Sequence, residues 1–364
     1  SMENLRSLIA ENAAVALAWG GLIIGIVFGA VVQRTNFCTM GSLSDMINFG
    51  DGRRFRSWWL ATATAIVGVL LLRGPGGVDL SKAMYLSTNL DWAGAAIGGL
   101  LFGFGMVFGG GCASRNLVRA GTGDLRSLIV LIVIAISGYV AMGGLLGPIR
   151  AAISTATSID LKGLGMASQS LGAFLARFTG VAPGSAETIM AVVVALAIAV
   201  WCFAHAPFRS SPVHIVAGVG VGLCVVAGWA LTGLAYDELA DTPIIPGSLS
   251  FVRPAGDTLE WMQRYTAIPI PNFGVATVFG TMIGAFLMAA MQGKLKLATF
   301  FDVSDTLRNL FGAILMGVGG VVALGCTVGQ AVTGASTLAV SSFIVFAGLI
   351  IGGVAGMKVL ENLD

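Results

Sequence analysis

The sequence predicts an all-α polytopic membrane protein with about nine transmembrane helices, short re-entrant helices and two inverted-topology repeats. The first observation is composition: the 364 residues are 56% hydrophobic and only 10% charged, with a mean hydropathy of +0.90, which excludes a soluble domain of this length. The second is the count of 52 glycines, because small residues let transmembrane helices approach closely. The third is a Gly-Cys pattern that recurs after two apolar segments.

Nine apolar segments are long enough to cross a bilayer. They lie at 13–33, 57–73, 93–110, 127–147, 187–205, 214–235, 273–292, 309–324 and 337–357. The first is not a cleaved signal peptide, because it lacks a basic n-region and a small-residue cleavage site. Lys and Arg are more numerous on the side reached after the odd-numbered spans. The positive-inside rule therefore predicts a bacterial inner-membrane protein with a periplasmic N-terminus and a cytoplasmic C-terminus.

Segments 98–127 and 312–341 resemble each other at a fixed offset of 214 residues. Matching pairs include Gly98/Gly312, Gly105/Gly319, Gly111/Gly325 and Cys112/Cys326. These are the third and eighth spans, and an odd separation means that the two copies enter the membrane in opposite directions, as in many transporters. We therefore predict a first half at 1–185, with spans 1–4 and a connector. The second half, 186–364, holds connector span 5 and spans 6–9 of the same integral membrane domain.

Four connecting segments are too apolar, or too rich in small residues, for ordinary solvent loops. They are 35–50, 112–125, 243–262 and 326–336. Non-helical backbone at membrane depth is tolerated only where it is buried in protein or lines a cavity, so we interpret them as re-entrant. The alternative is four short loops at the two surfaces. By the repeat, Ser248–Arg253 is the partner of Thr35–Cys38, although it lacks a cysteine.

Three of the five cysteines, Cys38, Cys112 and Cys326, follow apolar helices, and their recurrence favours one shared substrate path. A buried cysteine taken singly is usually a small hydrophobe, which is the prediction for Cys202 and Cys224 inside apolar helices. No CxxC pair is present and the chain has only two histidines, so neither a thioredoxin-type motif nor a zinc site is supported. The sequence predicts no metal and no cofactor.

Polar residues near these cysteines are predicted to support the path. They are Asn36, Ser114, Arg115, Asn116, Thr327 and Gln330. Arg34, Arg115 and Arg119 also place positive charge near the first two thiols, where the second repeat has Gly329 and Thr333. This charge favours an anion, although topology determination explains it equally well.

The remaining sequence patterns argue against two other classes of protein. A carboxylate pair, a Ser/His/Asp set and a phosphate-binding loop are all missing from the sequence, so we predict that the protein is not an enzyme. No basic run resembles a nucleic-acid surface, so no nucleic-acid partner is predicted.

Three segments resemble the signatures of the YeeE/YedE membrane proteins. They are Asn36-Phe37-Cys38, the block from Gly109-Gly110-Gly111-Cys112 to Asp124, and Gly325-Cys326-Thr327-x-Gly329. The resemblance implies thiosulfate uptake across bacterial inner membranes, nine spans with short re-entrant helices in an hourglass shape, and three cysteines along a narrow central path. It also implies a cytoplasmic TusA-like sulfur-carrier protein as a partner. Some relatives are linked to selenium metabolism instead.

Thiosulfate is a dianion with one soft terminal sulfur and three hard oxygens, and thiols and backbone N–H groups suit both ends. We therefore predict that a thiosulfate ion passes among Cys326, Cys112 and Cys38, in that order from periplasm to cytoplasm, within the lipid bilayer. Selenite, sulfite or a persulfide are alternative substrates. A membrane thiol relay or oxidoreductase is the alternative from another class, and it requires thiols close enough to form a disulfide.

Overall fold

The computed structural model describes residues 2–363, and its architecture is almost entirely helical. The long helices are α2 (Ala13–Thr35), α4 (Arg53–Arg73), α5 (Trp92–Phe108), α7 (Leu125–Met142), α10 (Pro183–Phe203), α12 (Pro212–Leu234), α14 (Phe273–Met291), α15 (Val303–Val322) and α16 (Val340–Glu361). Each overlaps one of the nine predicted spans. In the described part of the chain, eight helices are long and apolar enough to cross a membrane. The ninth long helix is α15, whose first two turns carry Asp305 and Arg308. The helices confirm an all-α polytopic membrane protein.

Short elements connect the long helices. They are α1 (Met2–Glu11), α3 (Thr39–Phe49), a 3₁₀ turn η1 (Met84–Leu86), β1 (Asn89–Leu90), α6 (Ala113–Gly121), α8 (Gly147–Thr157), β2 (Ile159–Asp160), a 3₁₀ turn η2 (Lys162–Leu164), α9 (Leu171–Thr179), α11 (Ala206–Arg209), α13 (Val252–Gln263) and the π-helix η3 (Val328–Gly334). β1 and β2 pair antiparallel, with Asn89 opposite Asp160. The four segments predicted to be re-entrant each contain one short helix, namely α3, α6, α13 and η3.

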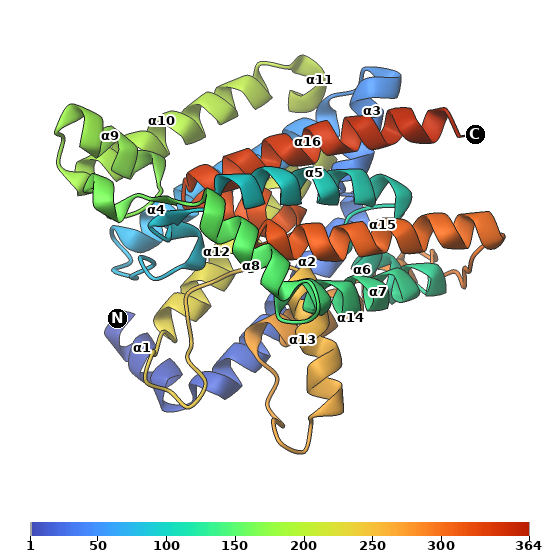
Figure 1. Ribbon diagram of the computed structural model, residues 1–364, viewed down its shortest axis with the longest axis horizontal. Helices are drawn as coiled ribbons and strands as arrows, with labels where there is room; N and C mark the ends of the chain where they lie inside the picture. Colours follow the sequence, from blue (N-terminus) through green and yellow to red (C-terminus); the bar gives the residue numbers. More distant parts are fainter. Residues whose placement is uncertain (1, 364) are drawn as a thin grey trace.

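The contacts between long helices follow an internal two-fold pattern. In the first half α2, α4, α5 and α7 follow one another, and in the second half α12, α14, α15 and α16 take the same order. The pair α2–α14 has its counterpart in α12–α4, and the pair α5–α16 has its counterpart in α15–α7. Figure 1 shows α5, α15 and α16 side by side.

The direction of the helices shows that the second copy is inverted. Helices α5 and α15 are counterparts, and they run antiparallel, since Gly98 packs against Ala323 whereas Gly105 packs against Gly312. Helices α2 and α12 are also counterparts and also antiparallel, with Gly20 against Leu231. Two halves related in this way form an inverted-topology repeat, as the sequence predicts.

Glycines bring paired helices into backbone contact. A Cβ added at Gly29 of α2 would lie 2.1 Å from the carbonyl oxygen of Thr281 in α14. A Cβ at Gly284 of α14 would lie 2.0 Å from the carbonyl oxygen of Ile26 in α2. Within lipid there is little hydrophobic drive to pair helices, so close van der Waals contact of this kind stabilises the pair.

Helix α10 lies at one edge of the bundle, packed on α4 and α9 (Figure 1). Several of its large apolar side chains are exposed, including Ile189, Val193, Leu196 and Val200. A contiguous apolar face of this kind on a membrane protein contacts lipid. This placement outside the two paired halves fits a connector between them.

We expect Gly29→Ala to destabilise the fold, because the new methyl group collides with the Thr281 carbonyl. Overpacking of this kind costs about 1–3 kcal/mol of the free energy of unfolding. The thermal unfolding midpoint of the purified protein in detergent measures the effect. Gly184→Ala is the matched control, because Gly184 is exposed in α10 and its added Cβ meets nothing within 4 Å. An unchanged midpoint for Gly29→Ala would show that this contact is not needed.

Candidate functional site

Cys38, Cys112 and Cys326 share one local backbone geometry. Two residues before each cysteine, the chain adopts a left-handed conformation that ends the preceding helix. These residues are Asn36 (φ 59°), Gly110 (φ 71°) and Leu324 (φ 58°). Cys38 and Cys112 are then the N-caps of α3 and α6, and Cys326 precedes η3 by two residues. Each cysteine therefore stands at a break between two helices.

Residue choice explains the break in the first half better than in the second. Gly110 and Gly111 both have positive φ, at 71° and 140°, and glycine adopts these values without a steric penalty. The second copy places Leu324 at the position of Gly110. A left-handed leucine costs on the order of 1–3 kcal/mol, so the surrounding contacts must hold it there.

The three thiols are buried, and two of them are neighbours. Cys38 is 5% exposed, Cys112 1% and Cys326 0%. The Cys38 and Cys112 thiols lie side by side, and the Ser114 hydroxyl lies 3.2 Å from the Cys112 sulfur. The Thr327 hydroxyl also lies beside the Cys112 thiol, without a well-directed hydrogen bond. Residues of both halves therefore meet at Cys112.

Backbone N–H groups point at two of the sulfurs. Gly41 N–H donates to the Cys38 sulfur at 3.5 Å, and Gly329 N–H donates to the Cys326 sulfur at 3.3 Å. Each donor is three residues after its cysteine, so the thiol caps the short helical segment that follows. N–H groups aimed in this way favour negative charge at the same place.

Asn116 and Gln330 hold the two Gly-Cys turns in place. The Asn116 amide donates to the carbonyls of Gly109 at 3.2 Å, Gly111 at 2.9 Å and Cys112 at 3.3 Å. Gln330, at the offset of 214 residues, donates to the carbonyl of Ala323, which is the counterpart of Gly109. Its amide oxygen accepts from the Ser342 hydroxyl at 2.6 Å. Both side-chain amides therefore donate hydrogen bonds to backbone carbonyls that would otherwise lack a donor.

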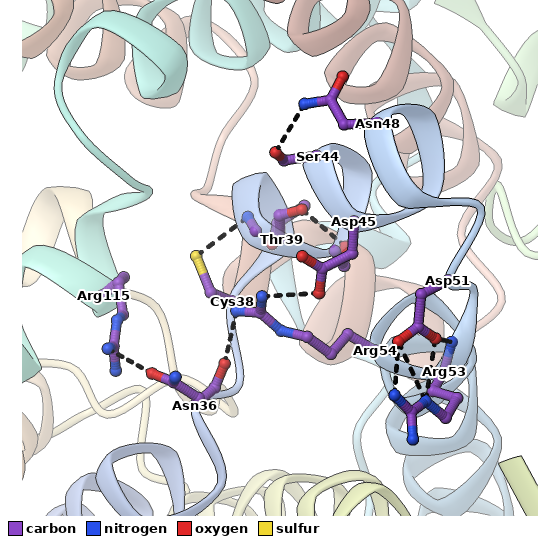
Figure 2. A network of polar contacts seen from close by, with 12 residues as sticks. Asn36, Cys38, Thr39, Ser44, Asp45, Asn48, Asp51, Arg53, Arg54 and Arg115 are labelled. Carbon is purple, nitrogen blue, oxygen red and sulfur yellow. Dashed lines mark hydrogen bonds and ion pairs between the residues drawn. The ribbon is translucent and has the colours of Figure 1, made fainter. Parts of the chain in front are cut away.

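Two arginines surround Asn36 beside Cys38 (Figure 2). The Arg54 guanidinium donates to the Asn36 carbonyl and pairs with Asp45, each at 2.8 Å, and Arg115 donates to the Asn36 side-chain oxygen at 2.5 Å. Arg54 Nε and Arg115 Nη1 are buried and lack a hydrogen-bond partner among the described residues. A buried N–H group without a partner costs free energy, so these two groups favour a hydrogen-bond acceptor beside them.

The sequence does not single out Arg54 as a neighbour of Cys38. The sequence places Arg34 near Cys38, but Arg34 is exposed in the structure. Arg54 lies near Cys38 instead. Arg119 donates to the carbonyl of Gly110. The run of arginines at 53–56 gives no signal that separates Arg54 from its neighbours, because only the tertiary fold brings α4 beside α3.

The carboxylates that the sequence places near span ends do pair with arginine. Asp45 pairs with Arg54, Asp124 with Arg126 at 3.4 Å, and Glu187 with Arg73 at 4.0 Å. Between α3 and α4, a hydrogen bond from Arg53 lowers the pKa of the Asp51 carboxyl to about 2 (Figure 2). Asp51 is therefore ionised at neutral pH.

The other two cysteines lie inside long helices. Cys202 is fully buried in α10 and its thiol donates to the Arg56 carbonyl at 3.4 Å. Cys224 is 5% exposed in α12, within the apolar core. All five cysteines are free thiols.

Two inverted halves of long apolar helices, with buried thiols at helix breaks, are typical of a multi-pass membrane transport protein. The chain belongs to the Sulphur transport family, whose pattern matches residues 34–355. This membership confirms the resemblance carried by the segments around Cys38, Cys112 and Cys326. It also identifies a transporter of sulfur species rather than an enzyme.

Curated relatives extend over most of the chain. A protein named thiosulfate transporter TsuA from Spirochaeta thermophila is 27% identical over 347 residues, which cover 92% of this chain and 97% of the relative. A thiosulfate transporter TsuA from Escherichia coli is 27% identical, with 85% of each chain covered. A probable transporter YedE from Escherichia coli is 30% identical over 107 residues, or 29% of this chain and 24% of the relative.

We expect Asn116→Ala to destabilise the fold, because the backbone carbonyls of Gly109 and Gly111 at the Cys112 turn would lose the side-chain donor, whereas the Cys112 carbonyl keeps the backbone N–H of residue 116. Leaving buried acceptors unsatisfied costs about 1–3 kcal/mol. Thermal unfolding in detergent measures the loss. Asn48→Ala is the control, since Asn48 donates only to the Ser44 hydroxyl in an exposed setting at 3.2 Å. Equal midpoints for the two variants would contradict a positioning role for Asn116.

Proposed function

We propose that this protein takes up thiosulfate through a path lined by Cys326, Cys112 and Cys38. The observation that carries the proposal is the meeting of the two inverted halves at Cys112, where Cys38 lies on one side and Thr327 on the other. Both full-length relatives are named thiosulfate transporters, which supports this substrate. Each thiol offers a polarizable sulfur and a weak S–H donor to the ion.

The charge distribution supports a direction of transport. Arg54 and Arg115 lie at the Cys38 end, whereas the position of Arg115 is occupied by Gly329 in the second half. A dianion is therefore attracted toward the Cys38 end, which the positive-inside rule places on the cytoplasmic side. Several weak contacts in series suit conduction, because a site that binds too tightly does not release.

The short helices α3, α6, α13 and η3 complete the proposal as re-entrant elements. Cys38, Cys112 and Cys326 all lie at or just before the first residues of these helices and are buried. In lipid, irregular backbone of this kind is stable only when surrounded by protein, as the carbonyls held by Asn116 illustrate. At the cytoplasmic end we expect a TusA-like sulfur-carrier protein to receive the sulfur.

The first test replaces the cysteines of the path one at a time. We expect Cys38→Ala, Cys112→Ala and Cys326→Ala each to lower thiosulfate uptake at least tenfold, because each removes a contact that no neighbour replaces. Uptake into cells that depend on thiosulfate as their sulfur source measures the effect. Cys202→Ala and Cys224→Ala are matched controls, since both thiols are buried but lie inside α10 and α12.

Comparable membrane abundance of all five variants is required for this comparison. Wild-type uptake by all three path variants would overturn the proposed path. Inhibition of thiosulfate uptake by added sulfite or selenite in cells with the wild-type protein tests the substrate. If either anion binds more tightly than thiosulfate, that anion is the substrate and thiosulfate is not.

The second test concerns Arg115. We expect Arg115→Gln to raise the KM for thiosulfate about tenfold, because a charge-assisted hydrogen bond contributes about 1.5–3 kcal/mol. Arg209→Gln is the control, since Arg209 is exposed and donates to the Phe203 carbonyl at 2.9 Å. A KM unchanged by Arg115→Gln would exclude this guanidinium as a contact to the ion.

A further inference from the structure

The inverted repeat leaves one position of the path without a thiol. Cys112 and Cys326 are counterparts at the offset of 214 residues, and Cys112 faces Cys38 from the segment before α3. The counterpart of that segment precedes α13, and there Ser250 faces Cys326. A serine hydroxyl thus stands opposite Cys326 where a thiol stands opposite Cys112.

Polar hydrogens surround the Cys326 sulfur. The Ser250 hydroxyl and the backbone N–H groups of Phe251, Val328 and Gly329 all interact with it. Phe251 and Val328 come from elements far apart in the sequence, so this grouping exists only in the folded chain. Cys326 is fully buried, whereas Ser250 is only partly buried. Ser250 is therefore the more exposed residue of the two.

A glycine makes this arrangement possible. A Cβ at Gly329 would lie 2.5 Å from the Ser250 hydroxyl oxygen, so a larger residue would displace it. The counterpart of Gly329 is Arg115, which contacts Asn36 beside Cys38. One end of the path is therefore cationic, and the other end offers neutral donors.

A second observation favours a ligand between the residues around Cys326 and those around Cys112. The Thr327 hydroxyl is fully buried and has no hydrogen-bond partner of good geometry among the described residues. It lies beside the Cys112 thiol and directly follows Cys326 in the chain. A buried hydroxyl without a partner is costly, and a bound oxyanion would satisfy it.

The same segment borders a cavity, although Ser250 itself does not line it. A cavity of about 530 Å³ is lined by Gly247, Ser248 and Arg253, which lie on both sides of Ser250 in the sequence. Ser248 itself donates to the Val225 carbonyl at 2.6 Å, so its hydroxyl is already used by the fold. Among these serines, Ser250 is the one that interacts with a path thiol.

We propose that the Ser250 hydroxyl is a fourth substrate contact, which binds an oxygen of the sulfur oxyanion beside the Cys326 thiol. This inference rests on the proposed function and extends it to the neutral end of the path. A hydroxyl is a stronger donor to a hard oxygen than a thiol is, whereas Cys38 and Cys112 offer two soft sulfurs. The ion is received through its oxygens at Ser250 and moves on toward the paired thiols.

Thiosulfate uptake kinetics of Ser250→Ala, Ser250→Cys and Ser248→Ala test this role in the full-length protein. Ser250→Ala is expected to raise the KM about tenfold, the loss of one hydrogen bond to an anion, with the maximal rate within twofold of wild type. Ser250→Cys is expected to have a KM between those of Ser250→Ala and wild type, because it restores a weaker donor at the same place. Ser248→Ala is expected to keep the wild-type KM.

The outcomes separate this inference from the proposed function. If Cys326→Ala abolishes uptake while Ser250→Ala keeps the wild-type KM, the path stands and the fourth contact is wrong. If Ser250→Cys has the same raised KM as Ser250→Ala, or if Ser248→Ala raises the KM equally, the hydroxyl acts on the fold and the inference is also wrong. If all cysteine variants transport like wild type, the proposed function itself fails.

Discussion

The need to satisfy backbone groups at helix breaks within a membrane is the constraint on which this structure depends. Helices α2, α5 and α15 all end one or a few residues before a cysteine, and each break exposes carbonyls that lipid cannot hydrogen-bond. Asn116 and Gln330 satisfy these carbonyls from matching positions. Because side chains hold the breaks, the thiols beside them keep fixed positions.

Close helix packing supports these breaks from outside. Parallel pairs such as α2–α14 bring backbones into contact through Gly29 and Gly284, and the pair α4–α12 repeats this contact in the other half. The glycines therefore serve two purposes: most permit close approach, while Gly110 and Gly111 permit the turn before Cys112. Glycine is therefore required for different physical reasons at different positions.

The two halves share their backbone plan but differ in the chemistry at the path. In the first half Arg115, Arg54 and two thiols lie together, whereas the second half combines one thiol, a serine and a glycine. A symmetric path would hold an anion equally at both ends. Substitutions at a few counterpart positions, such as Arg115 and Gly329, would be enough to give the proposed path a direction.

The sequence by itself determined the fold class, the long helices, the inverted repeat and the three cysteines at helix ends, because apolar length and recurrence at a fixed offset are linear properties of the chain. Only the tertiary structure decided that Arg54 lies near Cys38, since Arg54 reaches Asp45 and Asn36 when α4 packs beside α3. The contact between Ser250 and Cys326 was likewise decided only by the tertiary structure. Such contacts join side chains of different elements, and no local pattern records which side chains the folded backbone brings together.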